Sequence, residues 1–145
     1  MDKVKVYYTG DGVQPPHYQS SGAAGADVYA NLEEPVIVKP LERVMIPTGI
    51  SIALPAGYEA QIRPRSGLAW KQGLTVLNSP GTIDCDYRGE VKILLINVGD
   101  REVTISHGDR IAQIVIAPYT QGEFIQREKL DETDRGEGGF GSTGV

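Results

Sequence analysis

Apolar and polar residues alternate with a period of two along much of the chain. The alternation is clearest over residues 50–54, 58–63 and 102–106, where an apolar residue occupies every second position. Successive side chains of a strand point to opposite faces, so this pattern predicts half-buried β-strands. Residues 93–96 and 111–116 are apolar at nearly every position, which predicts two strands buried on both faces.

Turn-forming residues divide these segments. The chain contains 18 glycines and 9 prolines, spread between the apolar runs. This spacing favours short strands joined by tight turns, and the fold class expected is all-β, a barrel of jelly-roll-like architecture. One short helix is predicted after Arg65, with Ser66 as a candidate N-cap and Gly73 as the residue that ends it.

The chain is expected to form one domain followed by an arm. Its 145 residues are enough for a single core, which we place in residues 1–130 as one β-barrel domain. Residues 131–145 have no apolar periodicity and are rich in glycine and charge. They cannot bury enough surface to fold alone, so we expect a flexible C-terminal arm that orders on a ligand.

Composition restricts the classes of partner. The formal net charge of −5, without a basic stripe, argues against a nucleic-acid partner, although a few converging arginines can hold a small anion. No run approaches the roughly 18 apolar residues of a membrane helix. The N-terminal residues 1–7 have no apolar leader pattern, and the single cysteine excludes an internal disulfide. A cytoplasmic location is therefore expected, with no membrane partner.

Two segments contain candidate anion or metal contacts. Asp27 lies between a glycine turn and a predicted strand, where an isolated acid most often only caps a turn. The segment 64–67 places Arg65 and Ser66 at the start of the predicted helix, where backbone amides favour anions. A capped helix with a surface arginine is the alternative.

Residues 78–89 have the pattern of a hairpin. If 82–86 is extended, Asp84 and Asp86 share one face. Such a pair can be an acid/base pair, a metal site or only a solubilising hairpin tip.

The remaining candidate ligands suggest structural roles. Cys85 has acidic neighbours that oppose thiolate formation, so it is interpreted as a small core residue. His17 and His107 have no partners at metal-ligand spacing, which argues against zinc.

The glycine-rich tail, residues 135–144, contains a further candidate binding pattern. Gly136, Gly138 and Gly141 match G-x-G-x-x-G, but no βαβ unit accompanies them, so a Rossmann site is rejected. A glycine-rich arm can still wrap phosphates with its backbone amides. Phe140 has nothing to pack against unless a ligand stacks on it, although an ordinary disordered terminus is the alternative.

Five segments together resemble the motifs of the trimeric dUTPase family, in the family's order and over most of the chain. They are residues 24–30 (AGADVYA), 64–69 (PRSGLA), 81–89 (GTIDCDYRG), 108–113 (GDRIAQ) and 135–144 (RGEGGFGSTG). The resemblance implies a jelly-roll-type β-barrel, a homotrimer with sites between subunits, and an arm that closes a neighbour's site. It also implies hydrolysis of dUTP to dUMP and pyrophosphate, by water attack at the α-phosphorus. This activity limits uracil in DNA and supplies dUMP for dTMP synthesis.

The resemblance also implies roles for individual residues. Asp84 is similar to the acid that activates the attacking water, Tyr87 to the ring beneath the deoxyribose, and Asn78 to the residue beside uracil. The expected phosphate contacts are Arg65, Ser66, Gly67 and Gln113.

The metal and the arm complete the expected site. Asp27 would hold waters of a Mg²⁺ ion bound to the triphosphate, in line with the preference of Mg²⁺ for phosphate oxygens and retained waters. The arm would contribute Arg135, Phe140, Gly141, Ser142 and Thr143, with Phe140 stacked on uracil and the others near the phosphates.

Two other functions are compatible with parts of this sequence. A dCTP deaminase resembles this family in fold and needs a group that activates water against the base, for which Glu90 is the nearby candidate. A non-catalytic binding module on the same fold is the second, and the complete set of five motifs argues against it.

Overall fold

The computed structural model describes residues 2–144, and strands dominate this part of the chain. One helix, α1 (Ser66–Gln72), interrupts them. The strands are, in chain order, β1 (Tyr7–Thr9), β2 (Ala26–Tyr29), β3 (Val36–Val38), β4 (Arg43–Ala53), β5 (Tyr58–Arg63), β6 (Leu74–Val76), β7 (Gly81–Ile83), β8 (Glu90–Asn97), β9 (Val103–Ile105) and β10 (Arg110–Pro118).

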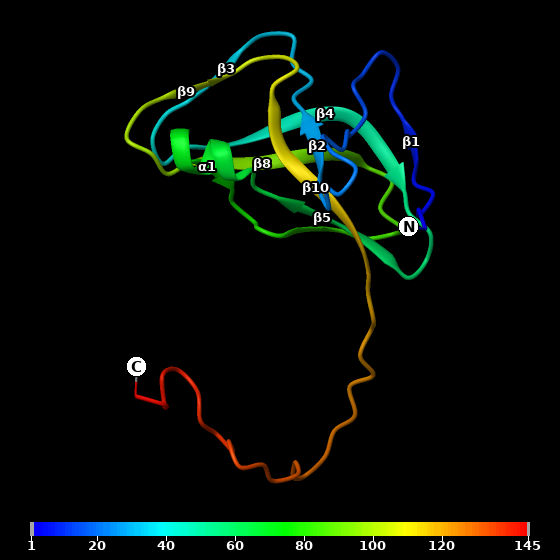
Figure 1. The fold of residues 1–145 in the computed structure, drawn as a ribbon, viewed down its shortest axis with the longest axis vertical. Coiled ribbons are helices and arrows are strands. Elements are labelled where there is room, and N and C mark those ends of the chain that lie inside the picture. The colour runs from blue at the N-terminus through cyan, green and yellow to red at the C-terminus, as the bar shows by residue number, and fades with distance from the viewer. Residues whose placement is uncertain (1, 145) are drawn as a thin grey trace.

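The strands form two four-stranded sheets and one two-stranded ladder. The sheet orders are β1-β4-β8-β6 and β2-β10-β5-β7, and β3 pairs with β9. Every pairing within them is antiparallel. The inner faces of both large sheets contribute to one hydrophobic cluster, so the sheets close around a shared core (Figure 1). The all-β prediction is confirmed.

The core follows the alternation in the sequence. In β4 and just after it, Ile50, Ile52 and Leu54 are buried as predicted. In β8, Leu95 is fully buried but Leu94 is only partly covered, and Met45, its partner across β4, is 60% exposed. The prediction that β8 is buried on both faces is therefore wrong for this single chain, because residues 2–144 place no second layer over its outer face.

The helix begins one residue earlier than its capping pattern suggested. The carbonyl of Arg65 accepts the first helical bond, from Ala69 N–H at 3.1 Å, so Arg65 and not Ser66 is the N-cap. Ser66 already has helical geometry, which is why its hydroxyl does not cap the helix. Gly73 ends the helix as predicted, with φ of 68°. On the outer side of α1, Trp70 is 89% exposed.

The chain leaves the barrel after β10. Residues 119–144 contain no strand or helix and extend away from the sheets (Figure 1). Phe124 in this segment is fully exposed. The boundary at residue 130 between barrel and arm stays a prediction. Within residues 2–144, no helix is long and apolar enough to cross a membrane.

The end of α1 gives a stability prediction. A Cβ added at Gly73 would lie 2.5 Å from the backbone nitrogen of Gly99. Gly12 has the same φ of 68° but no atom within 4 Å. Gly12→Ala should therefore cost only the left-handed strain, about 1 kcal/mol, whereas Gly73→Ala should cost about 3 kcal/mol or more because two backbone segments must separate. Denaturant unfolding of both variants measures the difference, and equal losses would contradict the packing argument.

Candidate active site

Three charged residues meet at one end of the barrel. They come from β2, from the start of α1 and from the start of β10. Asp27, on β2, is 7% exposed. Its Oδ1 lies 3.2 Å from Nε of Arg65, and its Oδ2 lies 3.4 Å from Nη1 of Arg110. Arg65 Nη1 also donates to the Arg110 carbonyl at 3.0 Å. The carboxylate therefore contacts one guanidinium with each oxygen.

Strand register brings these residues together. Strand β10 lies between β2 and β5, so Gln113 is opposite Asp27 on one side and Arg63 on the other. Two residues after Arg63 the chain reaches Arg65, at the same end of the sheet. Three of the five sequence motifs thus converge because their strands are neighbours.

Gln113 links the same three motifs. Its Nε2 donates to the Pro64 carbonyl at 2.9 Å. Its amide occupies the space where Gly25 would carry a Cβ. A glycine at position 25 is required by this close approach, not by the backbone angle. The site therefore depends on a side chain packed directly over a backbone.

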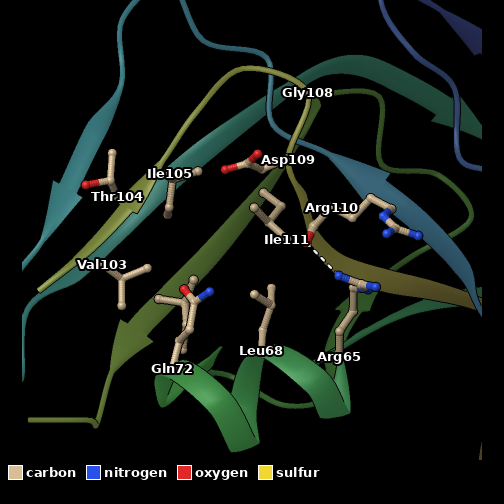
Figure 2. A pocket seen from close by; sticks show the side chains of 11 residues that line it. Arg65, Leu68, Gln72, Val103, Thr104, Ile105, Gly108, Asp109, Arg110 and Ile111 are labelled. Atoms are coloured by element: carbon tan, nitrogen blue, oxygen red, sulfur yellow. Dashed lines mark hydrogen bonds between the residues drawn. The ribbon is translucent and has the colours of Figure 1, made fainter. Parts of the chain in front are cut away.

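A pocket of about 320 Å³ adjoins the charged cluster. The inner side of α1 contributes Leu68 and Gln72, while β9 and the start of β10 form the opposite wall (Figure 2). The two arginines lie together at one end of this pocket (Figure 2). Ser66 and Gly67 lie beside it in the exposed first turn of α1. The arrangement is suited to a multiply charged anion.

A second pocket, also about 320 Å³, lies around the hairpin at residues 78–90. Asn78, Asp84 and Tyr87 line it above an apolar floor that includes Ile62 and Ile83. The Tyr87 hydroxyl donates to the Glu90 carbonyl at 3.0 Å, which fixes the ring. An apolar floor with a few polar groups suits a nucleoside.

The hairpin differs from its predicted shape. Strand β7 ends at Ile83, and Tyr87 N–H donates to the Asp84 carbonyl at 3.1 Å, which closes a turn. Asp84 and Asp86 are therefore not alternate positions of one strand, as the extended reading of 82–86 required. Within this turn, Arg88 Nη1 also donates to the Cys85 carbonyl, at 2.7 Å.

Cys85 has the structural role predicted for it. It is partly buried against the core. Its Sγ lies 3.5 Å from the Tyr119 hydroxyl. This hydrogen bond with Cys85 raises the pKa of Tyr119 above its ordinary value. The turn is thereby attached to the end of β10.

Asp84 and Arg65 lie toward opposite ends of β5. Ile83 is opposite Ala60, so Asp84 continues toward the beginning of β5, whereas Arg65 follows its end. Arg65 comes five positions after Ala60, which corresponds to roughly 15 to 20 Å at the rise of a strand. Within this chain, Asp84 and the arginines do not form one site.

The predicted arm residues do not join either cluster. Phe140 is fully exposed, and Ser142 and Thr143 are exposed. Arg135 Nε donates to the Gly138 carbonyl at 2.7 Å, a contact within the arm itself. Their assignment to substrate contacts stays a prediction.

Arg110 belongs to this cluster although its sequence pattern does not predict it. It lies in the segment GDRIAQ, of which Gln113 is the predicted contact. Its ion pair with Asp27 depends on the irregular pairing of β10 with β2, which shifts register between Arg110 and Ala112. Such a shift has no simple sequence signal, although an arginine two residues after a glycine at a strand start was an available hint.

The packing of Gln113 over Gly25 gives a second prediction. Gly25→Ala should displace the Gln113 amide, break its bond to Pro64 and lower the unfolding free energy by about 2 kcal/mol. Truncating Gln113 to alanine should remove the amide that a Cβ at position 25 would meet. The Gly25→Ala/Gln113→Ala double variant should therefore be more stable than Gly25→Ala alone in denaturant unfolding. A double variant as unstable as the sum of both changes would contradict this packing.

Comparison with known proteins identifies the fold and the family. The dUTPase family model matches residues 11–144. The chain is 57% identical over 135 residues to a deoxyuridine 5'-triphosphate nucleotidohydrolase of Treponema denticola, covering 93% of this chain and 94% of that one. It is 50% identical over 145 residues to the enzyme of the same name from Fusobacterium nucleatum, with 99% of each chain covered.

Solved structures agree with this assignment. A dUTPase of Staphylococcus bacteriophage 80alpha, a mutant solved with dUpNHpp, superposes with a TM-score of 0.87 at 26% identity, and the match covers 100% of both chains. The agreement extends over the barrel described above and confirms the family resemblance of the five motifs. The chain belongs to the dUTPase family.

Proposed function

We propose that this protein hydrolyses dUTP to dUMP and pyrophosphate. The observation that carries the proposal is the pair of pockets, one with the chemistry of a nucleoside and one with that of a phosphate chain. The curated relatives are named as dUTP nucleotidohydrolases, and the phage dUTPase was solved with dUpNHpp. Family membership and pocket chemistry thus support the same reaction.

The hairpin pocket is proposed to hold the nucleoside. Asn78 and the hairpin backbone would contact uracil, and Tyr87, fixed by its bond to the Glu90 carbonyl, would pack against the deoxyribose. Asp84 would accept a proton from the water that attacks the α-phosphorus. Its exposed position at the rim of this pocket leaves room for that water.

The arginine cluster is proposed to hold the phosphates. Arg65, Ser66, Gly67 and Gln113 would donate hydrogen bonds to the phosphate oxygens, where charge develops during the reaction. Residues 2–144 contain no group of three acidic, histidine or cysteine side chains that could enclose a metal. A lone acid such as Asp27 fits a Mg²⁺ ion held mainly by phosphates and water. When bound, Mg²⁺ would neutralise phosphate charge.

The site is proposed to require three copies of the chain. Asp84 and the arginines must act on the same triphosphate, yet they lie toward opposite ends of β5. A neighbouring copy would bring its hairpin to the arginine cluster. The extended segment after Pro118, with Phe124 fully exposed, would cover a neighbour and place Phe140 over uracil.

We also propose a cytoplasmic location and no nucleic-acid partner. The single cysteine is free, as expected in a reducing compartment. The net charge of −5 disfavours binding to a polyanion.

The activity proposal is tested by measuring pyrophosphate release from dUTP, dCTP, dTTP and UTP, with Mg²⁺ and with a chelator. We expect fast release from dUTP with Mg²⁺ and far slower release from the other nucleotides. UTP would be excluded because Tyr87 would leave no space for a 2′-hydroxyl, and dCTP and dTTP because the hairpin would accept only uracil. UTP turnover at a similar rate would contradict the role of Tyr87. Ammonia release from dCTP would indicate the deaminase and a role for Glu90.

The shared site is tested with two inactive variants. Asp84→Asn should lower kcat by about 10²–10⁴-fold, the usual loss for a general base. A chain ending at Asp134 should also be inactive but should keep the trimer and its melting temperature. If dissociated subunits of both variants are mixed and reassembled, activity should partly return, because an intact hairpin can meet an intact arm.

Each variant reassembled alone is the control for the mixture. Mixed trimers without recovered activity would mean that arm and hairpin of one site come from the same chain. A fully active monomer in light scattering would contradict the assembly itself.

A further inference from the structure

The turn that carries Asp84 has little contact with the rest of the chain. Among residues 84–89 only Cys85 is partly buried, and the others are exposed. Most hydrogen bonds of the turn stay within it or reach the first residue of β8. They run from Tyr87 N–H to the Asp84 carbonyl, from Arg88 Nη1 to the carbonyls of Cys85 and Tyr87, and from the Tyr87 hydroxyl to the Glu90 carbonyl. Such bonds shape the turn but do not attach it to the barrel, so an exposed turn of this kind can move as a unit.

One hydrogen bond connects this turn to a residue distant in the sequence. Sγ of Cys85 lies 3.5 Å from the hydroxyl of Tyr119, which comes 34 positions later. Within residues 2–144, it is the only hydrogen bond or ion pair that joins residues 84–89 to a residue outside 84–90. Cys85 also packs against the hydrophobic core. The attachment of the turn to the barrel therefore depends on Cys85.

Tyr119 is itself held in place. It follows directly after β10, whose last residue, Pro118, pairs with Tyr58. Its N–H donates to the Gly57 carbonyl at 3.0 Å, which binds its backbone to the turn before β5. The hydrogen bond with Cys85 raises the pKa of Tyr119 above its ordinary value, so the phenol keeps its proton at neutral pH. Tyr119 thus gives the turn a fixed point of attachment.

The attached residue is the immediate neighbour of Asp84. Strand β7 ends at Ile83, so Asp84 is the first residue beyond the ladder. On one side of it Ile83 is held by pairing with Ala60, and on the other side Cys85 is held by Tyr119. A catalytic group must stay within about 0.5 Å of its productive position, and a displacement of about 1 Å can lower a rate about 10²-fold. Without the contact to Tyr119, only one neighbour of Asp84 would be fixed.

We propose that Tyr119 is a positioning residue for Asp84, and that its hydroxyl acts through the sulfur of Cys85 to hold the turn in its active conformation. The proposal rests on the proposed function, since it takes Asp84 as the group that accepts the proton of the attacking water. Tyr119 itself would touch no substrate. It is also the first residue of the segment that leaves the barrel, so the root of the arm and the turn of Asp84 share one attachment point.

The experiment separates binding from the chemical step in the full-length protein. Calorimetric titration with the non-hydrolysable analogue dUpNHpp in Mg²⁺ gives the Kd, and single-turnover hydrolysis of dUTP with enzyme in excess gives the rate of the chemical step. Tyr119→Phe removes only a hydroxyl. We expect it to lower the single-turnover rate about tenfold while the Kd stays within about twofold of wild type, because the pocket is kept and only Asp84 is displaced. Cys85→Ala should have the same effect.

Combined substitutions test whether the two residues act through one contact. The Tyr119→Phe/Cys85→Ala double variant should be no slower than either single variant, because the contact is already lost in each. Cys85→Ser keeps a hydroxyl that can bond to Tyr119, so its rate should stay within about threefold of wild type. In the Tyr119→Phe background, Cys85→Ser should restore nothing, because a phenyl ring offers no hydroxyl.

Tyr58→Phe is the matched control. Tyr58 pairs with Pro118, beside Tyr119, and is also partly buried. Within residues 2–144 the tyrosine hydroxyls with a hydrogen-bond partner are those of Tyr29, Tyr87 and Tyr119, so Tyr58→Phe removes a hydroxyl without breaking a contact. It should keep the wild-type rate and Kd. Melting temperatures establish that every variant is folded, and Tyr119→Phe remains decisive if Cys85→Ala does not fold.

Each contrary outcome is distinct. A wild-type single-turnover rate in Tyr119→Phe would overturn the positioning role. A double variant slowed by the product of both single losses would show that the residues act independently, which contradicts the contact. A raised Kd with an unchanged rate would make Tyr119 a ligand-binding residue instead. In all three cases the wild type still hydrolyses dUTP, whereas a wild type without this activity would refute the proposed function itself.

Discussion

The arginine cluster, formed by Asp27, Arg65 and Arg110, depends on the position of β10 between β2 and β5. A single antiparallel register places Gln113 opposite Asp27 and Arg63 at once. Strand β10 starts at Arg110. Arg110 and Gln113, its first and fourth residues, therefore both lie near the same end of the sheet. Because sheet register changes only in whole residues, a slip of β10 by one position would send Gln113 to the other face and disassemble the cluster. The relative positions of these side chains are therefore set by the backbone hydrogen bonds between the core strands.

The same geometry keeps Asp84 and the arginine cluster apart within one chain. Strand β5 carries the arginine cluster beyond one end and supports the Asp84 hairpin near the other. Bringing them together within a chain would require a bend in the strand at the centre of its sheet. In the proposed trimer, association of identical chains would bring them together without deforming either pocket. The partly uncovered outer face of β8 is consistent with a fold that is completed by neighbours.

The sequence predicted the fold because the fold depends on local patterns. Most candidate site residues came instead from the resemblance to the family motifs, and their roles stay predictions. The alternation at residues 50–54 predicts burial of one face, and the left-handed Gly73 follows from its place after the helix. Ion pairs between strands that are distant in the sequence were harder to predict from such patterns. Arg110 reaches Asp27, 83 positions away in the chain, through a register shift between β10 and β2. This contact depends on long-range geometry, which periodicity does not encode. The turn at Asp84 is local, but alternation of residue types does not distinguish it from a continued strand.

Trp70 gives the protein a built-in optical signal. It is the only tryptophan of the chain, and it lies 89% exposed on the outer side of α1, the helix whose inner side lines the pocket with Arg65. The emission of an indole in water differs from that of an indole covered by protein. Any neighbouring chain or arm that closes over α1 would therefore change the colour of the intrinsic fluorescence. Closure of the site becomes observable in real time on the unlabelled protein, separately from the chemical step that follows it.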